Sequence, residues 1–337
     1  MQIFHILSCR TCVEGEKRVQ SLDSIVVSTV HTFPMFRPLP TFFVVLLFAV
    51  TLSAAERFEF EELHMGVPVR IILYAPTSEL AEKAAKEAFA SFQSLNDIMS
   101  DYDSESELSL LSESRGNIRI SDDLFTVLKA AKHYSTLSDG AFDITVGPMV
   151  RLWRRSRRQQ ELPKEEYIEQ AKQLVGNHLW ELDEKNLSVR LLKADIKFDL
   201  GGIAKGYAID KAFDIIQKHG ITSQLVDAGG DFRVGSPPPG TRGWKIAKND
   251  GIVLMKDTAM ATSGGRFQFV EIDGVRYAHI VDPKTGLGMT GLQTVHVTAP
   301  TAMEADALAT AVILLGKEKG KAMIDKLPKV AMEFVEP

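Results

Sequence analysis

The chain has 337 residues, of which 45% are hydrophobic, 25% charged and 8% aromatic, and this ordinary globular composition excludes disordered, collagen-like and coiled-coil proteins. Lysine and arginine number 39 against 44 aspartate and glutamate, which gives a net charge of -5. Because there is no basic excess for contacts with a phosphate backbone, the composition argues against nucleic-acid binding.

The N-terminal region has the pattern of a secretory signal peptide. Arg37 supplies a positive start, residues 41–52 form an apolar run, and Ser53-Ala54-Ala55 supplies the small residues that a signal peptidase reads. The run is shorter than the roughly 20 residues that span a bilayer, so the pattern favours cleavage after Ala55 over a membrane anchor. We therefore expect an exported protein, with a location on or anchored at the inner membrane as the alternative.

Domain boundaries and cysteine usage follow from this pattern. Both cysteines, Cys9 and Cys12, lie before the signal peptide, and their C-x-x-C spacing lacks the second ligand pair of a zinc site and the βαβ context of a redox pair. A mature chain without cysteine fits the bacterial periplasm, because a core of this size needs no disulfides. The predicted parts are an extension over 1–34 upstream of a true start at Met35, a signal peptide over 35–55, and a mature domain over 56–337.

Hydrophobic periodicity predicts helices and strands interspersed along the mature chain. The first elements are a strand or hairpin over 57–74, a helix capped by Ser78 that runs through Met99, and a polar loop that leads into a short helix over 99–114. The later ones are helices over 122–137, 164–174, 203–219 and 304–315, a hairpin over 187–200, and strands at 224–226, 232–234 and within 243–280. Because this order lacks regular βαβ spacing, we expect an α+β fold rather than a doubly wound sheet.

The segment from Asp199 to Lys205, Asp-Leu-Gly-Gly-Ile-Ala-Lys, is the first candidate site. Gly201 and Gly202 close a strand and open a helix, which would let a phosphate approach the N–H groups at the helix N-terminus, with Lys205 adding charge. The segment matches neither a Walker loop nor the G-x-G-x-x-G pattern. A tight turn without a ligand is an equal alternative.

Asp306 and Thr310 form the second candidate site. They are four residues apart near a predicted helix start, and therefore share one helix face. A carboxylate and a hydroxyl are hard oxygen donors, which suit Mg²⁺ better than zinc. Taken alone, the pair is better explained by an exposed carboxylate that favours the helix dipole beside a packed threonine.

Four further features of the sequence carry weaker signals. His279 alternates with apolar residues at a strand end, where a structural role is the usual one. Tyr102 lies in a polar loop and either stacks on a planar ligand or covers the loop. Thr262 and Ser263 precede Gly264-Gly265, and small residues of this kind allow close approach to a phosphate. The arginine-rich run over 151–158 predicts a solvated helix face, with contact to a polyanion or a membrane surface as the less favoured alternative.

Seven blocks in a fixed order give the sequence a resemblance to the ApbE family of flavin transferases, the FAD:protein FMN transferases. The resemblance covers about residues 56–330, nearly all of the mature chain. It implies an α+β fold with a T-fold-like core of two lobes and FAD in the cleft between them. The blocks are MSDYDSESELSLL, DGAFDITVGPMVRLW, DLGGIAKGYAID, LVDAGGDFRVG, ATSGG, YAHIVDPKTG and ADALATAVILLG.

The resemblance also implies a role for each candidate residue. Mg²⁺ would be held by the Asp306 carboxylate, the Thr310 hydroxyl and the backbone carbonyl of Ala204, and His279 would act as the general base. The residues implied to bind FAD are Met99, Tyr102, Asp199, Gly201, Gly202, Lys205, Asp227, Gly229, Thr262 and Ser263. Asp227 stands where the family often has Asn, and the chain ends without the Gly-Phe that many relatives show.

The implied reaction is transfer of FMN from FAD to a protein. A Thr or Ser hydroxyl of an exported acceptor attacks the phosphorus on the riboflavin side, and AMP leaves. The acceptor motif ends in Gly-Ala-Thr and occurs in subunits of sodium-pumping NADH:quinone oxidoreductase and of Rnf-type complexes. An Mg²⁺-dependent FAD pyrophosphatase would use the same residues. A non-catalytic flavin carrier ranks last, because the metal pair and the histidine are all present.

Overall fold

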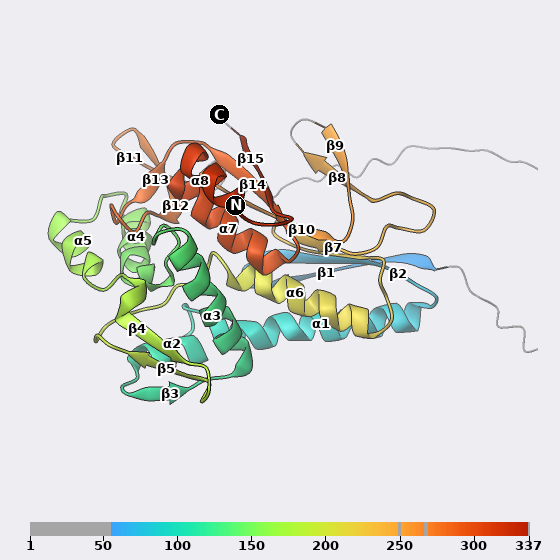
Figure 1. Cartoon of the computed structure of the whole chain (residues 1–337), viewed down its shortest axis with the longest axis horizontal. Helices are drawn as coiled ribbons and strands as arrows, with labels where there is room; N and C mark the ends of the chain where they lie inside the picture. Colours follow the sequence, from blue (N-terminus) through green and yellow to red (C-terminus); the bar gives the residue numbers. More distant parts are fainter. Residues whose placement is uncertain (1–54, 249–250, 266–268, 336–337) are drawn as a thin grey trace, which may run out of the picture. The chain divides into compact units, whose positions relative to one another are not determined.

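The structure, a computed structural model, describes residues 55–248, 251–265 and 269–335 (Figure 1). These residues belong to one unit that spans Thr51–Pro337. The upstream extension, the two cysteines and all of the predicted signal peptide except Ala55 lie outside the described residues. None of the helices in the described ranges combines the length and apolarity that a bilayer crossing needs.

A seven-stranded sheet with antiparallel pairing throughout forms the centre of the fold. The predicted hairpin is its first pair of strands, and Val69, Ile71 and Leu73 alternate toward the main core because side chains along a strand point to opposite faces. In spatial order the strands are β1 (Glu56–His64), β2 (Val67–Ala75), β6 (Gln224–Ala228), β7 (Asp231–Val234), β10 (Thr258–Gly264), β14 (Thr294–Ala299) and β15 (Ala331–Val335).

Three helices and this sheet enclose the main core: α1 (Ser78–Met99), α6 (Ala204–Lys218) and α7 (Ala302–Leu315). In Figure 1, α1 and α6 run side by side, and α6 also packs on α7, which lies against β10 and β14. The inner face of α1 is rich in buried alanines, so the helices approach closely. The cap of α1 is Thr77, whose side chain accepts a hydrogen bond from Leu80 N, so the prediction that Ser78 caps this helix is wrong.

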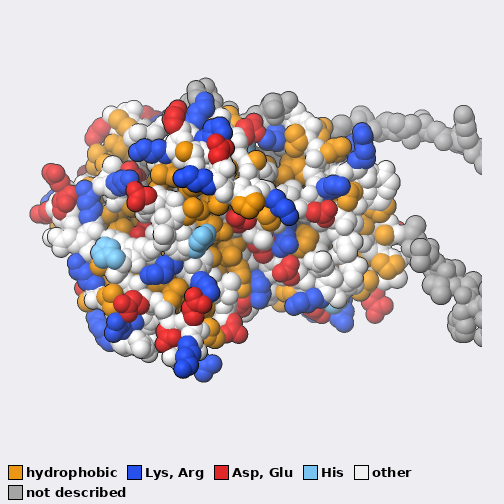
Figure 2. Space-filling model, in the orientation of Figure 1, with side chains coloured by type: hydrophobic (Ala, Val, Ile, Leu, Met, Phe, Trp, Pro, Cys, Tyr) orange, Lys and Arg blue, Asp and Glu red, His pale blue; other side chains and the backbone are white. Residues whose placement is uncertain are grey.

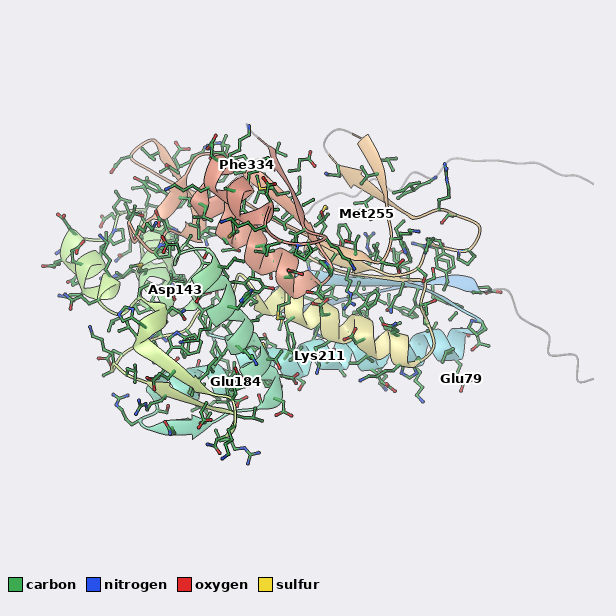
Figure 3. All side chains as sticks on the ribbon, viewed as in Figure 1. Glu79, Asp143, Glu184, Lys211, Met255 and Phe334 are labelled. Atoms are coloured by element: carbon green, nitrogen blue, oxygen red, sulfur yellow. The ribbon has the colours of Figure 1, made fainter. Side chains whose placement is uncertain are left out.

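The opposite face of the large sheet carries a smaller apolar cluster. Ile72 and Phe232 of the sheet pack there with Trp244. A hairpin of β8 (Trp244–Lys248) and β9 (Gly251–Met255) covers this side. Figure 3 shows Met255 on the hairpin side and Lys211 on the helical side of the sheet.

A second group of elements surrounds α3 (Asp122–Leu137), whose bounds match the prediction. It contains α2 (Glu107–Glu113) and a small sheet in the order β3 (Asn117–Arg119), β5 (Ser188–Leu191) and β4 (Trp180–Asp183). The predicted hairpin over 187–200 is wrong, because β5 pairs with β4 and β3 instead. Its alternating second half is real, since Ile196, Phe198 and Leu200 are buried, but these residues join no strand ladder.

A third group packs around Trp153 and Tyr277, and the Trp153 Nε1–H donates to the Ala278 carbonyl at 3.1 Å. Its elements are α4 (Gly147–Gln159), α5 (Glu165–Lys172) and the three strands β11 (Phe269–Ile272), β12 (Val275–Val281) and β13 (Gly288–Thr290). The remaining elements are α8 (Lys317–Ile324) and the short 3₁₀ turns Ile144–Val146 and Asn177–Leu179. Antiparallel sheets interspersed with helices confirm the α+β prediction, whereas the two lobes and the cleft stay predictions.

Candidate active site

The first turns of α6 and α7 cross in close contact. A Cβ atom at Gly206 would lie 2.3 Å from the Ala302 carbonyl oxygen, so only glycine fits this crossing. The Gly206 N–H donates to Asp306 Oδ2 at 3.0 Å, while the Ala302 and Met303 N–H groups donate to Asp210 at 2.9 Å each. Each helix thus places a carboxylate against the N-terminal N–H groups of the other, where the helix dipole favours negative charge.

The side chain of Asp306 is buried within this crossing. Thr301 caps α7 and the helix begins at Ala302, two residues before the predicted start, so Asp306 lies in its second turn and is only 6% exposed. The alternative of an exposed N-terminal carboxylate is therefore wrong. Burial raises the pKa of the Asp306 carboxyl, and the charge of Lys205 and the Gly206 N–H offset part of that rise.

Lys205, in the first turn of α6, contacts a second buried carboxylate. Its Nζ forms an ion pair with Asp231 Oδ2 and lies 4.0 Å from Asp306 Oδ2. The other oxygen of Asp231 accepts the Thr262 N–H of β10 at 2.8 Å. Sequence reasoning missed Asp231, although a carboxylate directly after the Gly229-Gly230 turn was a signal that it could have used.

Thr310 faces the Gly201-Gly202 turn, called the phosphate turn below, as its spacing from Asp306 along α7 predicts. A Cβ atom at Gly202 would lie 2.9 Å from Thr310 Oγ1, so the two residues are in direct contact. Ala204 begins α6 immediately after this turn. The structure therefore brings the three predicted metal ligands to the start of α6 and the adjoining face of α7.

These residues fit Mg²⁺ by the chemistry of their donors. One carboxylate, one hydroxyl and one backbone carbonyl are hard oxygen ligands, and Mg²⁺ takes few protein ligands because it keeps waters and binds substrate phosphates. Across the described part of the chain there is no group of three or more His, Cys, Asp and Glu that could hold a metal ion. A site built here would thus depend on substrate oxygens to complete its coordination.

The turn between β6 and β7 lies beside this cluster. Gly229 and Gly230 have φ values of 64° and 98°, which favour glycine, and the Gly230 N–H donates to Asp227 Oδ1 at 3.2 Å. Burial raises the pKa of the Asp227 carboxyl, while the Gly230 N–H and the Arg70 and Lys205 charges lower it. The predicted site residue Asp227 therefore lies within the electrostatic reach of Lys205, and Gly229 lies in the turn that follows it.

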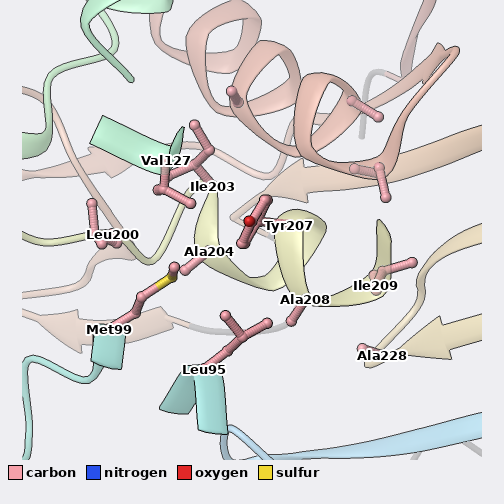
Figure 4. Packing of buried hydrophobic residues seen from close by; sticks show 14 of the residues in the cluster. Leu95, Met99, Val127, Leu200, Ile203, Ala204, Tyr207, Ala208, Ile209 and Ala228 are labelled. Atoms are coloured by element: carbon pink, nitrogen blue, oxygen red, sulfur yellow. The ribbon is translucent and has the colours of Figure 1, made fainter. Parts of the chain in front are cut away.

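Met99 and Tyr102 flank the C-terminal end of α1 but differ in exposure. Met99 is 4% exposed and points toward the first turn of α6 (Figure 4), which makes it part of the core beneath the site. Tyr102 is 80% exposed, and its ring lies 3.9 Å from the guanidinium carbon of Arg154. Of the two, only Tyr102 offers a surface for a planar ligand.

Arg154 connects this tyrosine with the phosphate turn. Its guanidinium donates to Asp101 Oδ2 at 2.6 Å and to Asp199 Oδ2 at 3.3 Å. Asp199 in turn accepts the Gly201 N–H at 2.9 Å. The prediction of a solvated arginine face on α4 is wrong for Arg154, whose side chain is 24% exposed.

The remaining predicted site residues lie on strands rather than at the start of α6. His279 is an exposed residue of β12, which α4 contacts through the bond from Trp153 to Ala278. Thr262 Oγ1 lies 2.8 Å from His296 Nδ1, and Ser263, its neighbour on β10, points to the opposite face of the strand. The base role of His279 stays a prediction.

Figure 2 shows positive and negative side chains intermixed on the visible face, with no surface of a single charge sign.

Comparison with models of protein families shows which family this chain belongs to. The model of the ApbE family matches residues 65–334. The chain belongs to the ApbE family. This confirms the resemblance drawn from the seven sequence blocks.

Curated relatives and solved structures agree with this membership. The FAD:protein FMN transferase of Vibrio cholerae is 32% identical over 247 residues, covering 69% of this chain and 73% of that protein. The FAD:protein FMN transferase of Escherichia coli K12 is 30% identical over 264 residues, 74% of each chain. The ApbE protein of Thermotoga maritima superposes with a TM-score of 0.74 at 31% identity, covering 83% of this chain and 94% of that one. The apo flavinyl transferase ApbE of Pseudomonas stutzeri gives 0.75 at 26% identity, over 85% and 93%.

Proposed function

We propose that this chain is an FAD:protein FMN transferase that moves FMN from FAD to a Thr or Ser hydroxyl of an exported protein. Family membership and the names of its relatives support the transferase activity. The observation in the structure that carries the proposal is the convergence of Lys205, Asp306 and Thr310 on the Gly201-Gly202 turn. This arrangement combines a cation and hard oxygen donors at the N-terminus of a helix, which suits a pyrophosphate together with a metal ion.

The metal ion of this reaction is Mg²⁺, held by the Asp306 carboxylate, the Thr310 hydroxyl and the Ala204 carbonyl. When bound, it would neutralise charge on the FAD pyrophosphate. The buried state of Asp306 supports this role, because a nearby cation stabilises the charged form of a carboxylate that burial disfavours.

The other residues bind the substrate and move one proton. Lys205 binds a phosphate oxygen at the start of α6, where the helix dipole also favours negative charge. His279 takes the proton of the acceptor hydroxyl while the hydroxyl oxygen forms a bond to the phosphorus on the riboflavin side. The bond from phosphorus to the AMP oxygen breaks, and FMN stays on the acceptor as a phosphoester. A neutral imidazole is a suitable base near neutral pH.

Incubation of the purified protein with FAD, Mg²⁺ and a candidate acceptor tests this function. The acceptor carries a Ser/Thr-Gly-Ala-Thr-like motif, as in subunits of sodium-pumping NADH:quinone oxidoreductase or Rnf-type complexes. We expect flavin fluorescence on the denatured acceptor band, and no signal with chelator or with the acceptor hydroxyl residue changed to Ala. Release of free FMN and AMP without a labelled acceptor would instead show an FAD pyrophosphatase, and unchanged FAD would refute both activities.

The proposed location is the periplasm, reached through the signal peptide over 35–55. The apolar run over 41–52 and the small residues Ser53-Ala54-Ala55 support this proposal. N-terminal sequencing of the protein from a periplasmic fraction should give Glu56 as the first residue. A cytoplasmic chain that still begins at Met1 would contradict it.

A further inference from the structure

The Arg154 side chain joins three segments that are distant in sequence. It lies on α4, pairs with Asp101 from the loop after α1, and pairs with Asp199 from the segment that leads to α6. Its guanidinium also lies over the ring of Tyr102, 3.9 Å from the ring centroid. One planar cation therefore contacts both a carboxylate beside the exposed tyrosine and a carboxylate beside the phosphate turn.

This geometry fixes the orientation of an otherwise exposed ring. Tyr102 is 80% exposed, so the face away from Arg154 is open to a ligand. A guanidinium stacks on aromatic faces, and two carboxylates hold it in a single plane. A ring that is already oriented costs less conformational entropy when a second planar group stacks on it.

We propose that Arg154 is a positioning residue of the FAD site. It backs the Tyr102 ring so that the open face receives a planar ring of FAD, and through Asp199 it holds the Gly201-Gly202 turn at a fixed distance from that ring. This inference rests on the proposed function, which makes FAD the substrate. The ligand it concerns is a planar ring joined to a pyrophosphate.

The charges around Arg154 agree with this role. Burial and the neighbouring Asp101 carboxylate raise the pKa of Asp199, and the Gly201 N–H and Arg154 offset part of that rise. Arg154 is thus a cation shared by two carboxylates. Asp101 and Tyr102 also line a pocket together with Arg151 and Lys197.

Binding measurements on Arg154 variants test the inference. Arg154→Ala should weaken FAD binding about tenfold, because the Tyr102 ring and the Gly201-Gly202 turn both lose the group that orients them. Arg154→Lys keeps the charge but not the planar fork, and should bind with intermediate affinity. Arg158→Ala, an exposed arginine on the same helix, is the matched control and should bind FAD as the wild type does. Flavin fluorescence anisotropy gives the Kd, and thermal melts verify that each variant is folded.

A double-mutant cycle separates positioning from general support. If Arg154 acts through Tyr102, the loss of FAD affinity caused by Arg154→Ala should be smaller in a Tyr102→Ala background. Titrations with FMN and with AMP should show which half of FAD loses affinity. Full additivity in the cycle, or wild-type affinity in folded Arg154→Ala, would overturn the inference. If Arg154→Ala fails to fold, wild-type affinity in Arg154→Lys would overturn it as well.

The same preparations distinguish this inference from the proposed function. Weaker FAD binding in Arg154→Ala, together with no flavin transfer by the wild type, would support the positioning role and refute the transferase. Flavin transfer by the wild type, together with unchanged FAD binding in Arg154→Ala, would refute the positioning role alone.

Discussion

Two regions around the predicted FAD site are built in opposite ways. The helix crossing consists of Lys205, Asp231, Asp306 and Thr310, which lie on α6, α7 and β7. The tyrosine ledge consists of Asp101, Tyr102, Arg154 and Asp199, of which only Arg154 lies within a helix. In the crossing, Asp306 and Asp231 accept main-chain N–H groups from other elements, whereas the segments of the ledge are joined by the Arg154 side chain. A site can therefore combine a rigid centre with a planar platform that depends on a single residue.

This difference decides how each region should respond to mutation. Main-chain donors remain when a neighbouring side chain is removed, so most of the crossing should survive a single change. The ledge loses two ion pairs and a ring contact with Arg154 alone. The following predictions test the rigid half, from the largest effect to the smallest.

Asp306 should be essential for activity without being essential for the fold. Asp306→Asn keeps an oxygen for the Gly206 N–H but loses the charge that a metal ion needs. Because burial disfavours the charged form of Asp306, the variant should be as stable as the wild type near neutral pH. We expect Mg²⁺-dependent turnover to fall below detection while the Tm is kept.

Asp306→Ala provides the contrasting variant, since it also removes the acceptor of the Gly206 N–H. An unsatisfied buried N–H costs about 1–3 kcal/mol, so this variant should melt at a lower temperature than Asp306→Asn. Asp325→Ala, at an exposed position after α8, is the control. Full turnover in Asp306→Asn would remove Asp306 from the metal site.

His279 should affect the rate of transfer and leave FAD affinity nearly unchanged. A positioned base contributes about 10²- to 10⁴-fold, so His279→Ala should slow transfer to the acceptor by that order. His219→Ala, at the far end of α6 where the ring pairs with Glu87, is the matched control. Rate and Kd measured on one folded preparation decide the role. A parallel loss of FAD binding would make His279 part of the scaffold, and an unchanged rate would exclude it from the site.

Sequence reasoning succeeded where local pattern determines structure. The helix Asp122–Leu137 was predicted to the residue because a capping serine precedes a clear helical period. Asp306 and Thr310 share a face because spacing along a helix fixes direction. The strand Thr294–Ala299 was missed although Val295, Val297 and Ala299 alternate toward the core. The edge strand Ala331–Val335 has no comparable alternation, so no pattern predicts it.

The same reasoning failed where a role depends on tertiary contacts. Arg154 resembles its exposed neighbours in sequence, and only the approach of Asp101 and Asp199 distinguishes it. Asp231 takes its role from Lys205, 26 positions earlier in the chain. Burial of Asp306 follows from the glycine contact between α6 and α7, which no local period encodes.

The smallest expected effect concerns Arg233, which supports the helix crossing from outside. Arg233 Nη1 donates to Asp210 Oδ1 at 3.0 Å, and Asp210 also accepts the Ala302 and Met303 N–H groups. Those two donors remain in Arg233→Met, and methionine keeps apolar contact. We therefore expect the free energy of unfolding to fall by about 1–2 kcal/mol near neutral pH, with no change in FAD affinity.

The loss in Arg233→Met should depend on pH in a defined direction. Burial already raises the pKa of Asp210, and removal of the Arg233 charge raises it further. The folded variant then binds more protons than the unfolded chain at pH values above the ordinary aspartate pKa of about 3.9, so its stability falls as pH rises through that window. Urea unfolding from about pH 4 to about pH 7 should show the deficit growing, with exposed Arg242→Met as the control. A deficit that is constant across this range would mean that Arg233 acts by packing rather than by charge.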